Sequence, residues 1–159
     1  MYSTNTMIEF ARISDLVEIG DISRKYIEHD LAWNYTPEKL ARLLKSDKKN
    51  LVVARSGTQL VGFGMMTYYA EHANLDLLAV KFRHRYQGIG RQLVEWLEKV
   101  ALTAGTFTVY VQVRKMNAGA LKFYHTLGYT IIGERQGYYQ GQEAGIMLAK
   151  NLRKTLLTK

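Results

Sequence analysis

The sequence of 159 residues contains no cysteine and only one proline. The lack of cysteine excludes a disulfide framework, a thiolate metal site and a cysteine nucleophile. No apolar run approaches the roughly 18 residues that a membrane-spanning helix needs. Residues 1–15 also lack the basic stretch followed by an apolar stretch that marks a signal peptide. We therefore expect a soluble, cytoplasmic protein with no membrane contact, and no metal site is predicted.

Linker-like segments are also missing. No Gly/Ser-rich stretch, low-complexity tract or internal repeat interrupts the chain, so we expect one domain over residues 1–159. The formal net charge of +8 attracts polyanions in general, such as nucleic acid, an anionic cofactor or an acidic partner, although a merely basic surface is the alternative. No zinc-finger spacing or RNP-type aromatic motif supports nucleic-acid binding. We expect no nucleic-acid partner.

Hydrophobic periodicity predicts alternating strands and helices. The expected strands cover residues 7–12, 50–55, 59–69, 74–80, 106–114, 130–133 and 143–152. The expected helices cover residues 14–26, 36–44, 88–104 and 117–127, with caps at Ser14, Thr36 and Asn117. The strand–helix–strand succession over 74–114 implies a right-handed parallel crossover, whereas the hairpin over 50–69 implies antiparallel neighbours. The sequence therefore predicts an α/β protein with a mixed sheet and helices on its faces.

The segment from Leu77 to Val100 carries the most specific local pattern. An apolar strand leads into a basic turn that contains Gly88 and Gly90, and the turn opens a long helix with one apolar stripe. Helix N-termini present unpaired N–H groups and about half a positive charge. A diphosphate would fit there, and a tight turn without a ligand is the alternative. The spacing is neither the dinucleotide-binding fingerprint nor a P-loop.

Two motifs resemble those of the GNAT N-acetyltransferase family. Residues 85–90 (RYQGIG) match its Arg/Gln-x-x-Gly-x-Gly/Ala motif, after a strand that matches the family's fourth. Residues 117–124 (NAGALKFY), followed by Leu127, Gly128 and Tyr129, look like its second acetyl-CoA motif. Both stand in the family's order and spacing. The resemblance implies an acetyl-CoA-dependent N-acetyltransferase whose mixed sheet is mostly antiparallel, with a parallel central pair and helices on both faces.

The resemblance also assigns coenzyme contacts. Backbone groups around Leu78 and Val80 would pair with the pantetheine arm, amides of residues 85–90 would hold the diphosphate, and Asn117 would contact the arm. Tyr124 would protonate the leaving thiolate, since a phenol of pKa about 10 can donate to a thiolate whose thiol has a pKa of about 8.5; a packed aromatic is the alternative. The expected coenzyme-binding residues are Leu78, Ala79, Val80, Arg85, Tyr86, Gln87, Gly88, Ile89, Gly90, Arg91, Asn117 and Tyr124.

The acceptor side of the expected site is less marked. The Tyr138–Tyr139 pair, Val113, Arg114 and Asn117 resemble the protein N-terminal acetyltransferases of the family, including the bacterial ribosomal-protein alanine type. That subgroup is expected to carry an acidic residue or a histidine where this chain has Gln112. Glutamine cannot accept a proton at neutral pH. The residues expected to bind the acceptor are Trp33, Tyr35, His72, Gln112, Tyr138 and Tyr139.

Asp76 is the candidate general base. His72, Asn74 and Asp76 fall on one face of their strand by the period of two. Asp76 interrupts an apolar stretch, where a carboxylate needs a partner. It would take the amine proton or bind a cationic acceptor, and a purely structural hydrogen-bonding role is the alternative. His72 has a suitable pKa as well, although a histidine at a strand end is commonly just exposed.

These observations predict transfer of an acetyl group from acetyl-CoA to a primary amine by direct attack in a ternary complex. A peptide or protein N-terminus is favoured, because an α-amine titrates at about 8 and a lysine amine at about 10.4, so the former needs a weaker base. The alternatives are a small amine (polyamine, amino acid or aminoglycoside) as acceptor, and a non-catalytic acyl-CoA-binding module. Gln112 favours the module and Tyr124 argues against it. The family often dimerises, so a homodimer stays open.

Overall fold

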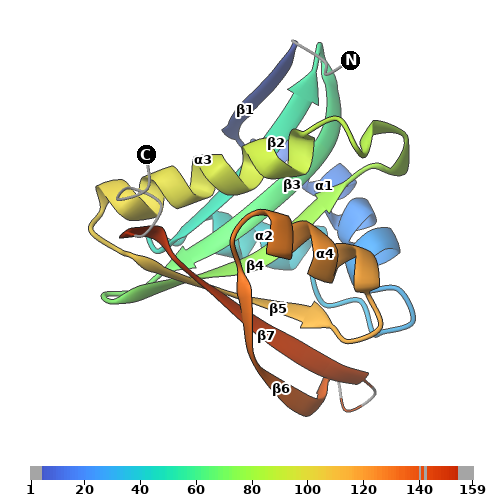
Figure 1. Cartoon of the computed structure of the whole chain (residues 1–159). Coiled ribbons are helices and arrows are strands. Elements are labelled where there is room, and N and C mark those ends of the chain that lie inside the picture. Colours follow the sequence, from blue (N-terminus) through green and yellow to red (C-terminus); the bar gives the residue numbers. More distant parts are fainter. Residues whose placement is uncertain (1–4, 140, 142, 154–159) are drawn as a thin grey trace.

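One mixed sheet forms the centre of the computed structural model, which describes residues 5–139, 141 and 143–153. Among these residues the sheet has seven strands in the order β1-β2-β3-β4-β5-β7-β6 (Figure 1). The strands are β1 (Thr6–Phe10), β2 (Lys49–Ser56), β3 (Gln59–Tyr68), β4 (His72–Val80), β5 (Thr108–Arg114), β6 (Thr130–Tyr139) and β7 (Glu143–Asn151). Neighbouring strands run antiparallel except β4 and β5, which are parallel.

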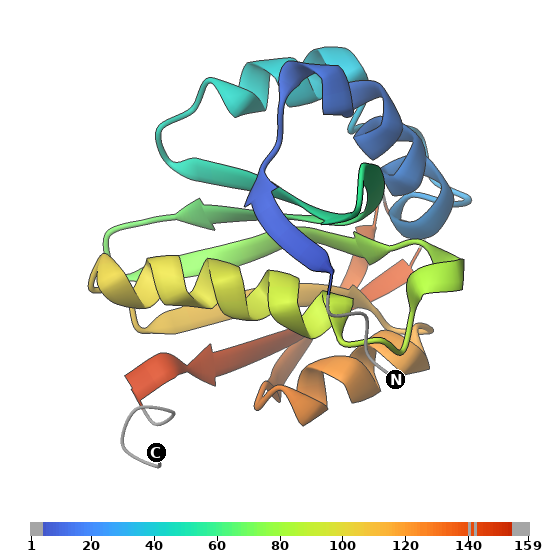
Figure 2. The ribbon, with the colours of Figure 1, turned by 90° about the horizontal axis from the view of Figure 1, so that it is seen from above.

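The helices cover both faces of the sheet, as Figure 2 shows from above. α1 (Leu16–Ile22) and α2 (Pro37–Leu44) lie on one face, and α3 (Ile89–Thr103) and α4 (Ala118–Thr126) lie on the other. A π-helical turn, η2 (Ser23–Ile27), continues α1. Short 3-10 turns, η1 (Ile13–Asp15) and η3 (Phe82–His84), precede α1 and follow β4. No helix in the described ranges is both long enough and apolar enough to span a membrane.

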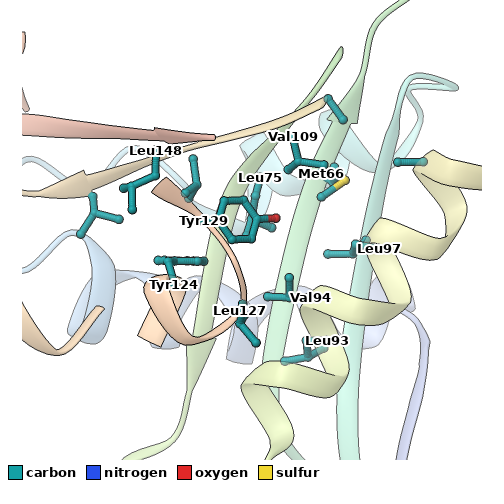
Figure 3. Close-up of a cluster of buried hydrophobic side chains, with 14 of the residues drawn as sticks. Met66, Leu75, Leu93, Val94, Leu97, Val109, Tyr124, Leu127, Tyr129 and Leu148 are labelled. Atoms are coloured by element: carbon teal, nitrogen blue, oxygen red, sulfur yellow. The ribbon is translucent and has the colours of Figure 1, made fainter. Parts of the chain in front are cut away.

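Each face of the sheet has its own hydrophobic core. On the α1/α2 face, buried Ile19 and Leu40 pack against Phe63 of β3. On the other face, Leu93 and Leu97 of α3 join a larger cluster with strand residues and with side chains at the end of α4 (Figure 3). Burying apolar side chains on both faces explains why the central strands are almost continuously apolar.

The parallel pair separates halfway along its length. β4 and β5 pair only from His72↔Thr108 to Leu75↔Val111, after which β4 keeps β3 and β5 keeps β7 as partner. The separation coincides with a bulge in β4. Consecutive residues Met65 and Met66 of β3 face Leu77 and Leu75, so Asp76 is the extra residue between them. Because a bulge bends its strand, β4 turns away from β5 and leaves an opening.

The fold predicted from the sequence is confirmed: a mixed, mostly antiparallel sheet with one parallel pair and helices on both faces. The Thr36 and Asn117 caps are present, since their side chains accept hydrogen bonds from the amides of Lys39 (3.3 Å) and Ala120 (3.0 Å). The Ser14 cap is wrong. The chain instead enters the helical segment through η1, where the Arg12 amide donates to the carboxylate of the next acidic residue, Asp15.

The sixth strand is longer than predicted. Residues 130–133 were expected, but β6 extends to Tyr139 because it pairs with β7 as far as Tyr139↔Glu143. Nearly all of β6 is exposed on both faces, so its sequence lacks the alternation of apolar and polar residues by which a strand is recognised.

Candidate active site

Two hollows meet where β4 and β5 separate. The first, of about 520 Å³, lies beside the end of β4 and the N-terminus of α3, and we call it the α3 hollow. The second, of about 580 Å³, lies between the two strands and the segment before α2, and we call it the tyrosine hollow because Tyr35, Tyr138 and Tyr139 line it. The residues common to both are Tyr26, Leu78, Asn117, Ala120 and Tyr124. The hollows therefore form one continuous cleft with two ends.

The α3 hollow gathers the predicted coenzyme residues. All of them except Gln87 line it: Leu78, Ala79, Val80, Arg85, Tyr86, Gly88, Ile89, Gly90, Arg91, Asn117 and Tyr124. Gly88 has φ +81°, a left-handed conformation that glycine adopts without strain. A side chain at Gly90 would meet the Phe123 ring at 3.1 Å, so this glycine lets α3 and α4 approach each other. The motif 85–90 thus builds the turn that exposes the helix N-terminus.

The exposed edge of β4 fits an extended ligand arm. Beyond Leu75, the edge facing β5 has no partner strand in the described part of the chain. An extended group laid there would pair with the backbone as an added strand does. Arg85 stands at the end of this edge, where its Nε donates to the Val80 carbonyl (3.1 Å) and its guanidinium lies over the Tyr26 ring. A free strand edge, a basic turn and a helix N-terminus together suit a ligand that has an extended arm and an anionic group.

Tyr124 stands at the junction of the two hollows. It is 6% exposed, and its ring contacts Phe123 (5.0 Å) and Tyr129 (5.5 Å) edge to face, which fixes its orientation. Burial, together with the nearby Tyr139, raises the pKa of its hydroxyl above the usual value. The group therefore stays protonated at neutral pH. It can donate a proton at the junction, but it does not act as a base there.

Asp76 points its carboxylate toward β2 and β3 at the edge of the tyrosine hollow. Its Oδ2 accepts a hydrogen bond from the Thr67 hydroxyl and lies 3.8 Å from the Lys49 ammonium. Burial raises the pKa of Asp76, and the Thr67 and Lys49 contacts oppose part of that rise. A carboxylate with a raised pKa is a stronger base than an exposed one, so the environment suits a proton acceptor.

Glu28 is a second carboxylate in the tyrosine hollow, and the sequence analysis missed it. It is buried, and its oxygens accept hydrogen bonds from the Ser23 hydroxyl (2.8 Å) and from the amides of Asn34 (2.6 Å) and Tyr35 (3.2 Å). Glu28 thereby holds the segment before α2 against η2. A single glutamate near a helix end carries no sequence signal, since such residues are mostly exposed.

Tyr35 and the Tyr138–Tyr139 pair form the aromatic walls of the tyrosine hollow. Burial, with the charges of Asp76 and Glu28 nearby, raises the pKa of Tyr35 to about 12. Tyr138 and Tyr139 pack edge to face with their ring centres 4.9 Å apart. Burial also raises the pKa of Tyr139, so the hydroxyls of Tyr35 and Tyr139 stay protonated at neutral pH and take part only in hydrogen bonds.

Two of the predicted acceptor residues lie outside the lining of this hollow. Trp33 packs under the Arg24 guanidinium (5.1 Å) and beside Gly20, in the role of a loop anchor. His72 stacks on Tyr69 (4.7 Å) and contacts the edge of Tyr110 (5.4 Å). The period of two does bring Asn74 and Asp76 into the hollow together, but His72 lies too far along β4.

An ionic clamp borders the opening of the tyrosine hollow. Arg114 of β5 pairs with Glu143 of β7 (2.6 Å), and its guanidinium also donates to the His29 carbonyl (2.8 Å) after η2. The pair lowers the pKa of Glu143, so the carboxylate is charged at neutral pH. The clamp joins three segments that are distant in sequence.

Comparison with known proteins identifies the family. Residues 16–129 match the acetyltransferase (GNAT) family. The chain belongs to this family. The matched residues of this GNAT protein include both predicted coenzyme motifs, whereas Tyr138 and Tyr139 of the tyrosine hollow lie beyond them.

The relatives of this GNAT protein acetylate different amines. The ribosomal protein bS18-alanine N-acetyltransferase of Salmonella typhimurium is 32% identical over 94 residues, which are 57% of this chain and 64% of that protein's length. The spermidine N(1)-acetyltransferase of Thermoplasma acidophilum is 28% identical over 131 residues, which are 79% of this chain and 81% of that protein.

Solved structures share the fold. Ard1 from Thermoplasma volcanium superposes with a TM-score of 0.85 at 21% identity, over 94% of this chain and 99% of its own. The PaiA N-acetyltransferase of Thermoplasma acidophilum in complex with coenzyme A gives a TM-score of 0.77 at 20% identity, over 92% and 98%. The family predicted from the sequence is confirmed, and its enzyme class is the predicted one, an acetyl-CoA-dependent N-acetyltransferase.

Proposed function

We propose that this GNAT protein transfers the acetyl group of acetyl-CoA to the amine at the N-terminus of a peptide or protein. The observation that carries the proposal is the meeting of two hollows at one protonated phenol, Tyr124. The α3 hollow, with its basic turn, suits an anionic coenzyme, and the tyrosine hollow would offer its aromatic walls to the acceptor. Both ligands would be bound at once, so the amine would attack directly in a ternary complex.

The coenzyme would occupy the α3 hollow. The free edge of β4 from Asp76 to Val80 would hold the pantetheine arm, and the amides at the start of α3 would hold the diphosphate. Acetyl-CoA, when bound, supplies a thioester whose carbonyl carbon is open to attack by an amine. The PaiA enzyme shares this fold and was solved in complex with coenzyme A, so the fold accommodates that coenzyme.

The residues at the junction would balance the proton transfers. Tyr124 would donate its proton to the sulfur as the C–S bond breaks and the C–N bond forms. The amine nitrogen would give up one proton, which Asp76 would take directly or through water. One proton would therefore move from nitrogen to sulfur in each turnover, and exchange with solvent would restore both side chains.

Three features favour an N-terminal amine. The relative from Salmonella typhimurium is named for an alanine of ribosomal protein bS18, and the match spans 64% of that protein. The Tyr138–Tyr139 pair resembles that subgroup and lines the acceptor side. An α-amine is also neutral far more often than a lysine amine at pH 7, because its pKa is about 8 and not about 10.4.

Release of free thiol from acetyl-CoA tests the proposal. The acceptors would be a hexapeptide with a free N-terminal alanine, the same peptide with a blocked N-terminus and one lysine, and spermidine. We expect release with the first peptide only, and mass spectrometry should place the acetyl group on its α-amine. Release with the blocked peptide alone would contradict the choice of the α-amine.

A polyamine is the second candidate acceptor. Two carboxylates, Glu28 and Asp76, face a hollow in a protein whose net charge is +8, and such a pocket attracts a polycation. The similarity to a spermidine N(1)-acetyltransferase agrees with this possibility. Faster thiol release with spermidine than with the free peptide would favour it.

A further inference from the structure

Gln112 presents an unused hydrogen-bond acceptor inside the tyrosine hollow. Its neighbours on β5, Val111 and Val113, are buried in the core on the α3 face, so Gln112 projects from the opposite face and lines the hollow. Its Oε1 is buried, and no hydrogen-bond partner lies near it in the described part of the chain. Native proteins seldom leave a buried carbonyl oxygen unpaired, because its lost hydration is not replaced.

The two carboxylates in the hollow already accept hydrogen bonds from the protein. Oε2 of Glu28 accepts a hydrogen bond from the Ser23 hydroxyl, and Oε1 accepts from the amides of Asn34 and Tyr35. Asp76 shares its Oδ2 between the Thr67 hydroxyl and the Lys49 ammonium. Gln112 differs from both carboxylates, because its Oε1 accepts no hydrogen bond within the described part of the chain.

We propose that Gln112 orients the acceptor: its Oε1 accepts a hydrogen bond from an N–H of the attacking amine and turns the amine lone pair toward the junction at Tyr124. The inference rests on the proposed function, because it takes the tyrosine hollow as the place of the amine. A glutamine takes no proton, so it orients the amine without deprotonating it. Proton removal is left to another group, which suits an amine that enters already neutral.

Three variants separate recognition from a structural role. Gln112→Leu removes the oxygen at similar length, Gln112→Glu keeps an acceptor oxygen there, and Gln59→Leu makes the same change at an exposed position at the start of β3. The measurements are titration calorimetry of the free N-terminal alanine hexapeptide into the protein saturated with coenzyme A, the coenzyme affinity itself, and the midpoint of thermal unfolding.

We expect Gln112→Leu to weaken peptide binding about tenfold, the effect of one lost hydrogen bond to a buried group. Coenzyme affinity should stay at the wild-type value. The unfolding midpoint should be unchanged or higher, because the folded protein loses an unpaired polar group. Gln112→Glu should bind the peptide within about threefold of wild type, since it still accepts a hydrogen bond. Gln59→Leu should match wild type in peptide binding.

Two results would overturn the role of Gln112. One is wild-type peptide affinity in Gln112→Leu, with or without a lower unfolding midpoint, which would leave the residue a structural role at most. The other is equal loss in Gln112→Leu and Gln112→Glu, which would assign recognition to the amide N–H₂ group. Failure of the proposed function is distinguishable from both, because the wild-type protein would then neither bind nor acetylate the peptide.

Discussion

At the scale of single residues, the hydroxyl of Tyr124 is the group on which the chemistry depends. We expect Tyr124→Phe to lower kcat at least about a hundredfold, as loss of a general acid does, while coenzyme affinity stays close to wild type because the ring and its contacts remain. Steady-state kinetics and calorimetry measure the two effects. Tyr69→Phe, at a half-exposed tyrosine outside the cleft, is the matched control. Unchanged kcat in Tyr124→Phe would remove this residue from the mechanism.

The raised pKa of Tyr124 also predicts a pH profile. The hydroxyl acts in its protonated form, and burial raises its pKa above the usual 10. The active form therefore persists through neutral pH and is lost only when the pH passes the raised value. We expect kcat to show no alkaline decline up to pH of about 10, when measured in buffers where the protein stays folded. A decline centred near pH 8 would show that some other acid donates the proton.

At the scale of elements, a buried ion pair joins α3 to β7. Glu98 of α3 accepts hydrogen bonds from the Lys150 ammonium (3.1 Å) and the Tyr129 hydroxyl (2.8 Å). We expect Lys150→Met to destabilise the fold by roughly 3–5 kcal/mol, because it leaves an unpaired buried charge. The double variant Glu98→Leu/Lys150→Met should recover much of that loss. Urea unfolding measures both, and an equal or larger loss in the double variant would contradict the explanation.

The sequence predicted those parts of the site that depend on local residues, but not those that depend on contacts between distant segments. The turn at 85–90 and the cap at Asn117 depend on neighbours in the chain, so their residue types and spacing were enough to predict them. The bulge at Asp76 depends on the register with β3, and the place of Glu28 depends on the segment before α2 folding back on it. Such contacts between distant segments leave no periodic mark in one sequence.

At the scale of the whole molecule, the net charge of +8 acts on ligand binding. Coenzyme A is an anion, and its hollow is bordered by Arg85 and Arg91. We expect the affinity for coenzyme A to fall about three- to tenfold between low salt and 0.5 M salt, because ions screen charges beyond the Debye length. Calorimetry at a series of salt concentrations measures the change. Salt-independent affinity would mean that hydrogen bonds and packing dominate coenzyme binding.

The separation of β4 and β5 has a kinetic consequence. Since the two hollows share only the residues at their junction, we expect neither ligand to pass through the binding place of the other to reach its own. Acetylated product and free coenzyme would leave by separate exits as well. We therefore expect the bulge in β4 to permit a random binding order, in which either substrate binds first.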